Sequence, residues 1–353
     1  MNKISTILLF LLITHLYGYA QNSVVTNAIL YERDGDIENA KKQIDLAIVH
    51  EKTKSVSKTW YYKGLIYSDI YKSDKVEVKQ LTQDALKTST EALLKSKELD
   101  PAKGEYYKLS DQLLQENWAN LINRGIAYYQ GGKYEDAIQM YELAQAINPA
   151  DTTAYVYGTY SAEGLKKNDL IQKYTDKLLE IKYKGLYIYT IAVRTALLDK
   201  NYNKAIEISK KGLTDYPLNS TLLEFQTLSY IEGSKAEEGL TNINDQLKTK
   251  PYEVNLLISQ AVLYTSLNNN DKAMEAYQKI IAIEPHNFFA NYNSAVINFD
   301  KGRLLAQKGD KTGSQTLFSK ALENAKRAKS LATDESDLAN LDKLITELNT
   351  ILK

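Results

Sequence analysis

Cysteine is absent from the 353-residue sequence, and histidine occurs only three times. Without cysteine the chain forms no disulfide, no thiolate metal site and no cysteine nucleophile, and it cannot carry a lipid on an N-terminal cysteine. The histidines, His15, His50 and His286, have no second metal-binding side chain at ligand spacing. The sequence therefore predicts no metal site and no cofactor.

Excess charge of either sign is also missing. Lysine plus arginine number 44 and aspartate plus glutamate number 44, so the formal net charge is zero. Proteins that bind nucleic acid usually need a strong basic field, and we expect no nucleic-acid partner here. Proline is scarce as well, with five residues, which is typical of a chain that consists mostly of helices.

The few prolines are regularly spaced. Pro217, Pro251 and Pro285 follow one another at equal intervals, and Pro149 precedes Pro217 by twice that interval. Alanines repeat in the same register, because Ala137, Ala205 and Ala273 are also separated by twice the interval. A fixed period of about 34 residues indicates a chain built from stacked repeats.

The clearest repeat covers residues 118–151 and reads as two amphipathic helices joined at a Gly-Gly turn. Gly125 lacks a side chain, so the second helix can cross close to the first, and Ala137 is the matching small residue on that second helix. Tyr141 fills the space beside the crossing, and Pro149 cannot continue the helix. These residues resemble the tetratricopeptide repeat, a helix–turn–helix unit of about 34 residues.

The resemblance predicts the fold class and the domain organisation. We expect an all-α, right-handed α-solenoid of about eight helix–turn–helix units, forming a single domain over residues 21–353, because stacked repeats share one continuous core. The expected units are 21–54, 57–101, 118–151, 152–185, 186–219, 220–253, 254–287 and 288–332, and a helix at 335–352 is expected to cap the stack.

Two stretches interrupt the regular period. The unit 57–101 is about thirteen residues too long, and the excess lies around residues 71–81, which are polar and predict an extended helix end or a solvated loop. Apolar residues then recur at helical spacing without a breaker from residue 102 to residue 129. This pattern predicts one long helix whose C-terminal part begins the repeat at 118–151.

The N-terminus resembles a secretory signal. Lys3 supplies a positive charge, residues 7–13 are apolar, and Gly18 and Ala20 are small residues at the positions that a signal peptidase reads. We expect cleavage of residues 1–20, a mature chain that begins near Gln21, and a periplasmic or secreted protein of bacterial type. Association with a membrane would then be indirect only.

Short matches to catalytic motifs do not hold up. A Gly-Gly-Lys sequence at residues 131–133 lacks the upstream strand and the following serine or threonine of a phosphate-binding loop. A Ser-x-x-Lys sequence at 55–58 and a Lys-Thr-Gly sequence at 311–313 are not completed by the third motif of penicillin-binding enzymes. The sequence thus predicts no catalytic residues and no enzyme.

A binding surface remains. In tetratricopeptide repeat proteins the first helix of each unit lines a concave groove that holds partners. The register assigns to this groove, among others, Ile122, Glu224, Leu228, Ile258 and Phe289.

We expect the main contacts between 118 and 219, where the units are uninterrupted. The predicted partner-binding residues there are Tyr129, Tyr160, Tyr187, Arg194 and Ile126. The resulting hypothesis is a non-enzymatic scaffold of the bacterial envelope that binds a protein or peptide. The alternative is a hydrolase or transferase with an unrecognised site in the groove.

Overall fold

The computed structural model of the protein describes residues 24–353. The predicted signal segment, residues 1–20, lies outside the described residues. Every regular element among residues 24–353 is a helix. Contacts divide the chain into two compact units after Tyr183, called the N-terminal and the C-terminal unit below. The all-α architecture of an α-solenoid, which the repeat period predicted, is confirmed.

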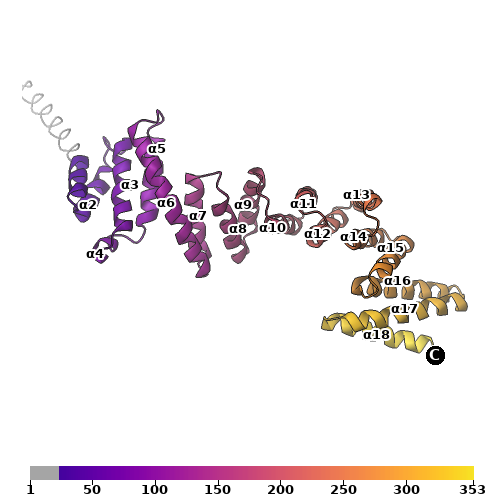
Figure 1. Ribbon diagram of the computed structural model, residues 1–353. Helices are drawn as coiled ribbons and strands as arrows, with labels where there is room; N and C mark the ends of the chain where they lie inside the picture. Colours follow the sequence, from indigo (N-terminus) through magenta and orange to yellow (C-terminus); the bar gives the residue numbers. More distant parts are fainter. Residues whose placement is uncertain (1–23) are drawn as a thin grey trace, which may run out of the picture. The chain divides into compact units, whose positions relative to one another are not determined.

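The N-terminal unit is a series of helices that pack against their neighbours in sequence (Figure 1). After a helical segment at residues 24–33 come α2 (Ile37–Ala47), α3 (Ser57–Lys72), α4 (Val76–Lys79), α5 (Ala85–Glu98), α6 (Glu105–Gln130), α7 (Tyr134–Ile147), α8 (Thr152–Gly164) and α9 (Asn168–Glu180). The long helix expected at 102–129 is α6. Of the extra residues near 71–81, the first two end α3, which stops at Lys72. The others belong to a loop that contains the single-turn helix α4.

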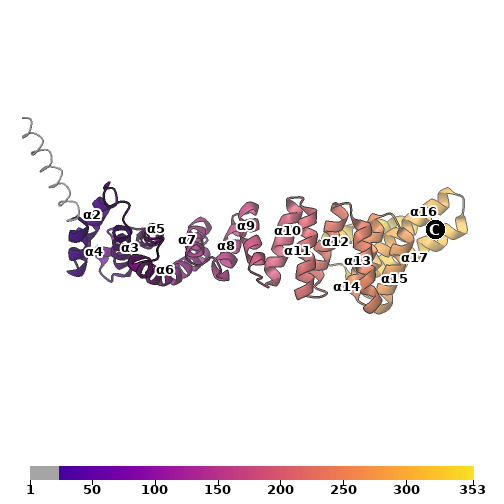
Figure 2. The same ribbon diagram turned by 90° about the horizontal axis from the view of Figure 1, so that it is seen from above.

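The C-terminal unit continues the same pattern (Figure 2). Its helices are α10 (Leu186–Leu198), α11 (Tyr202–Asp215), α12 (Ser220–Glu232), α13 (Ala236–Thr249), α14 (Val254–Ser266), α15 (Asn270–Ile283), α16 (Phe288–Gln307), α17 (Lys311–Leu331) and α18 (Glu335–Ile351). The last helix buries Leu341 against Ala325 and Ala328 of α17, while most of its other side chains reach solvent. It therefore covers the apolar face of the last pair, as a capping helix must.

The turn between the two helices of a pair recurs with the repeat period. A left-handed backbone conformation, with φ between 56° and 71°, occurs at Gly132, Lys166, Lys200, Ser234 and Asn268, which are equivalent positions of successive repeats. The next residue in each turn donates its N–H to a carbonyl five residues earlier, at 2.7 to 3.0 Å. This bond belongs to the Schellman motif, which ends a helix and satisfies its last carbonyl groups. The period thus fixes the backbone as well as the side chains.

The close crossing of α6 and α7 follows the predicted chemistry. Gly125 lies against Tyr141, and an added Cβ at Gly125 would lie 2.8 Å from Cζ and 2.9 Å from Cδ1 of that ring. Ala137 and Tyr141 are both completely buried. The two helices can approach this closely because Gly125 leaves room for the whole tyrosine ring.

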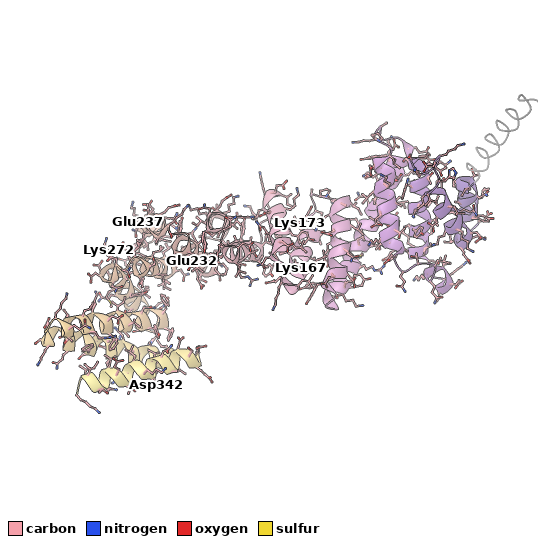
Figure 3. The ribbon with its side chains drawn as sticks, turned by 180° about the vertical axis from the view of Figure 1, so that it is seen from behind. Lys167, Lys173, Glu232, Glu237, Lys272 and Asp342 are labelled. Carbon is pink, nitrogen blue, oxygen red and sulfur yellow. The ribbon has the colours of Figure 1, made fainter. Side chains whose placement is uncertain are left out.

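Charge pairs tie neighbouring helix pairs together within each unit. Lys173 of α9, labelled in Figure 3, places Nζ 3.0 Å from Oε1 of Glu142 on α7, and Tyr174 donates its hydroxyl to the same oxygen at 3.2 Å. In the C-terminal unit Lys210 of α11 places Nζ 3.4 Å from Oε1 of Glu238 on α13. Exposed pairs of this kind stabilise a fold only weakly.

Candidate protein-binding groove

A groove of about 550 Å³ lies in the C-terminal unit between the first helices of three successive pairs, α12, α14 and α16. We call it the α12–α14–α16 groove. Its lining consists of Ser220, Leu223, Glu224, Thr227, Leu228, Ile231, Asn255, Ile258, Ser259, Val262 and Phe289. The volume is in the range of pockets that hold small ligands or a short stretch of peptide.

The repeat period explains why these side chains meet. Ile258 is one repeat after Glu224, Val262 is one repeat after Leu228, and Phe289 is one repeat after Asn255. Equivalent positions of adjacent helices therefore line one surface. Along α12 the lining residues recur every three or four positions, which is the spacing of one helix face. The groove is a direct product of the repeat.

Most of the groove surface is apolar. Leu228 is 41% exposed and Phe289 is 36% exposed, whereas Leu223 at the base is buried. The Phe289 ring is held edge-on against Tyr277, with ring centroids 5.9 Å apart. Large apolar side chains that stay partly open to solvent can gain free energy when a partner covers them.

The polar groups of the groove are mostly engaged with the backbone. Thr227 donates its hydroxyl to Leu223 O at 2.7 Å, and Asn255 donates from Nδ2 to Leu218 O at 3.3 Å. Glu224 is the one charged side chain among the lining residues, and it makes no ion pair within 4 Å among the described residues. Binding there would depend on apolar contact, with a single carboxylate available at the surface.

The predicted tyrosine contacts fall partly into a cluster of the N-terminal unit. Tyr129 of α6 and Tyr160 of α8 have ring centroids 6.2 Å apart, and the Tyr157 ring lies 6.2 Å from the first and 5.8 Å from the second. Ile126 packs against the same core. Three of the five predicted residues are therefore in one neighbourhood, and Tyr129, Tyr160 and Ile126 are all half-buried.

Burial raises the pKa of the Tyr160 phenol, and the nearby phenols of Tyr183 and Tyr129 raise it further. The hydroxyl is thus neutral over the physiological range and can donate a hydrogen bond. Because the rings pack against one another, part of their surface is already covered within the protein itself.

Tyr187 and Arg194 lie in the C-terminal unit, both on α10, where Tyr187 is 39% exposed and Arg194 is also exposed. The structure does not bring them together with Tyr129 and Tyr160 in one unit, and the predicted surface over 118–219 stays a prediction. The expectation that Ile122 lines a groove is wrong, because this side chain is 7% exposed and belongs to the core.

The sequence register places groove residues at 220–289 as well as at 118–219. The register already assigned Glu224, Leu228, Ile258 and Phe289 to the groove surface, and the structure places all four around one cavity. The repeat period does not indicate between which helices a cavity remains open to solvent. That depends on the volumes of side chains such as Thr227 and Ser259, which are small and lie between the larger apolar residues.

Among residues 24–353, no three histidine, aspartate or glutamate side chains lie close enough to hold a metal ion. None of the helices in the same range is both long and apolar enough to cross a lipid bilayer.

Comparison with protein families finds the repeat at two places. Two models of the tetratricopeptide repeat match residues 118–151 and residues 254–287. Both segments coincide with units that the sequence period predicts, and the second contains α14 and α15 beside the groove.

Similar proteins carry the same repeat. The TPR repeat-containing protein YpiA of Bacillus subtilis is 27% identical over 150 residues, which are 42% of this chain and 35% of that protein. Tetratricopeptide repeat protein 1 of Schizosaccharomyces pombe is 22% identical over 220 residues, 56% of this chain and 21% of that protein. The match thus spans only about a third of the first protein and about a fifth of the second.

Among solved structures, the C-terminal part of a TPR repeat-containing protein from Cytophaga hutchinsonii is 12% identical to this chain. The alignment covers 65% of this chain and 95% of that one, with a TM-score of 0.43.

Proposed function

The chain is a member of the tetratricopeptide repeat family, and we propose that it is a non-enzymatic scaffold that holds a segment of a partner protein in the α12–α14–α16 groove. Tetratricopeptide repeats generally mediate interactions between proteins. The observation that carries the proposal is the open apolar cavity of about 550 Å³, lined by equivalent positions of three successive repeats. A segment that lies across the three helices would cover Leu228, Ile258 and Phe289 together.

The partner segment should be mainly apolar. Only one charge, that of Glu224, lies along the groove, so long-range attraction contributes little and the affinity should change little with ionic strength. A basic residue in the segment, placed opposite Glu224, would add a rim ion pair worth at most about 1 kcal/mol.

Phage display of random peptides on the purified protein would supply a ligand for the test, and calorimetry would measure its affinity. Leu228→Ala and Phe289→Ala should each weaken binding about tenfold, because truncating a central apolar contact costs about 1–2 kcal/mol. Matched controls are Leu267→Ala and Tyr252→Ala, which remove exposed side chains of the same unit, 38% and 78% exposed, outside the lining.

Equal effects of the groove variants and the controls would contradict the proposal. So would a selected peptide whose affinity collapses at moderate salt. Turnover of a panel of glycans and peptides by the wild-type protein would instead favour the hydrolase or transferase alternative.

We also propose that the protein works in the bacterial envelope, as a periplasmic or secreted protein. The support is the sequence of residues 1–20, with its positive start, apolar run and small residues before Gln21. Sequencing of the protein isolated from its native cells should find an N-terminus near Gln21. An intact Met1 in a membrane pellet would contradict this proposal.

A further inference from the structure

A second, larger cleft lies in the N-terminal unit, beside the residues that interrupt the repeat period. It has a volume of about 790 Å³, and we call it the insertion cleft. Its lining consists of Ile70, Tyr71, Lys72, Lys79, Thr82, Gln83, Ala85, Asn120 and Arg124. These residues come from the end of α3, from α4 and the loop after it, from the start of α5, and from α6.

The extra residues of this repeat help to build the cleft. Lys79, Thr82 and Gln83 belong to the segment between α3 and α5, which the other helix pairs replace with a short turn. Loops inserted into a solenoid tend to lie on one face, often the binding face. The insertion supplies three of the side chains that line the cleft, so it shapes a surface as well as connecting two helices.

The cleft carries positive charge that the protein does not neutralise. Lys72 forms an ion pair with Glu116 of α6, so its charge is compensated. Lys79 and Arg124 make no ion pair within 4 Å of a carboxylate among the described residues. The lining residues include three cations, Lys72, Lys79 and Arg124, and no carboxylate. This composition, in a chain of zero net charge, distinguishes the cleft.

Arg124 is held in place. Its Nε and Nη2 both donate to the Tyr128 hydroxyl, at 3.1 and 2.9 Å, and the guanidinium lies 5.4 Å from the Tyr128 ring centroid. Asp84 and Asp136 line a small cavity of about 40 Å³ that also touches Arg124, without coming within 4 Å of it as an ion pair. An arginine fixed on one edge, with Nη1 not used in these bonds, is suited to bind a carboxylate.

The rest of the lining fits a peptide better than a free anion. Tyr71 offers apolar surface because its ring is only half-buried, and the buried side chains of Ile70 and Ala85 lie behind it. The carboxamides of Gln83 and Asn120 can each donate to a peptide carbonyl and accept from a peptide N–H. A phosphate ion would need neither the apolar surface nor the carboxamides.

We propose that the insertion cleft is a second binding site, which takes an acidic segment of a polypeptide through Lys79 and Arg124. The acidic side chains pair with the two cations, and neighbouring apolar residues of the segment cover Tyr71. This site lies in a different unit from the α12–α14–α16 groove. The cleft would bind acidic side chains, whereas the groove would bind an apolar segment. The two sites would let one chain hold two different segments.

The test uses the full chain and an array of octapeptides of random composition, with amidated C-termini. In about 0.05 M salt, where exposed charges are weakly screened, peptides bound by the wild-type protein should be enriched in aspartate and glutamate. The variant Lys79→Gln/Arg124→Gln should lose this enrichment and bind the best acidic peptides at least about fivefold more weakly. Circular dichroism checks that the variant is still helical.

The matched control is Lys108→Gln, which removes one exposed cation from α6 away from the cleft and should leave the enrichment unchanged. The groove variant Leu228→Ala should also retain it, so failure of the groove proposal does not affect this result. An array without acidic enrichment, or equal enrichment in the cleft variant, would overturn the inference. Competition by millimolar inorganic phosphate that is as effective as the acidic peptide would also overturn it, because the site would then take free anions.

Discussion

Replacing Gly125 with alanine tests the close crossing of α6 and α7. The new Cβ would lie 2.8 Å from Cζ and 2.9 Å from Cδ1 of Tyr141. That ring cannot easily move, because it is fully buried and stacks on Tyr157, with centroids 6.0 Å apart and planes inclined by 27°. Tyr157 in turn touches the rings of Tyr129 and Tyr160.

Two opposing terms set the magnitude. Overpacking in a well-packed core costs about 1–3 kcal/mol. Alanine in place of glycine within a helix returns about 1 kcal/mol. We therefore expect Gly125→Ala to destabilise the N-terminal unit by about 1 kcal/mol net. In a Tyr141→Leu background the ring is gone, and the same substitution should stabilise by up to about 1 kcal/mol. The coupling between the two positions is then about 2 kcal/mol.

Urea unfolding followed by tryptophan fluorescence measures the effect in the right unit. The chain has two tryptophans, Trp60 and Trp118, and both lie in the N-terminal unit. Gly158→Ala in α8 is the matched control. Its added Cβ would lie 3.2 Å from the Tyr174 ring, a smaller overlap that the helix preference of alanine over glycine should largely offset. If Gly125→Ala costs the same with and without the Tyr141 ring, the crossing is not what requires glycine.

Three further outcomes can be measured in the same way. Gly132→Ala should cost about 1 kcal/mol because its φ is +71°; nothing lies within 4 Å of an added Cβ, so the cost would come from the backbone alone. Gly131→Ala, at φ −82°, should cost much less. Equal costs would refute the turn geometry. Ala137→Leu should destabilise by about 1–3 kcal/mol through overpacking, and an unchanged melt would show that the helix register is wrong. Burial, together with the Glu32 carboxylate, raises the pKa of Asp69 to about 6. Between about pH 4 and pH 6 the folded state holds a proton that the unfolded state releases, so the stability of the fold falls as the pH rises through this range. Asp69→Asn should therefore stabilise the fold by about 1 kcal/mol near neutral pH but not below pH ~4. A gain in stability at both pH values would contradict this.

The repeat period predicted the helices because each repeat is local. A small residue at the crossing, a tyrosine beside it and a proline after the pair occur within a single repeat, and each has a steric reason that needs no distant contact. The turns were predicted only where glycine marked them. Lys166, Lys200 and Ser234 adopt the same left-handed conformation as Gly132, although such residues rarely do. Their conformation is imposed by the two helices that they join.

The binding surface was less predictable, because side-chain volumes decide whether the space between two helices is filled or open. Period and helix spacing identified Leu228, Ile258 and Phe289 as groove residues, but the same rules identified Tyr129 and Tyr160 as well. In the N-terminal unit the tyrosine rings pack against one another and fill the space between α6 and α8. Around the α12–α14–α16 groove, smaller side chains leave a cavity. Which of the two occurs depends on packing in three dimensions, which a one-dimensional period does not contain.

The insertion illustrates the converse case. Its polar composition predicted a solvated loop or helix end, and the structure has a loop with a single helical turn at Val76–Lys79. The sequence could not indicate that Lys79 would lie at the same cleft as Arg124, because the two residues are far apart along the chain. They meet at one cleft because α5 and α6 pack side by side and bring the two segments together.

Hydrogen–deuterium exchange with a selected peptide tests the central claim most directly, since it reports where the partner segment lies without any substitution. If the segment occupies the α12–α14–α16 groove, exchange should slow in α12, in α14 and in the first turn of α16, which carries Phe289. The surrounding helices α11 and α17 should be unaffected. Protection confined to the tyrosine cluster of the N-terminal unit, or no protection in α12 and α14 at saturating peptide, would contradict the account.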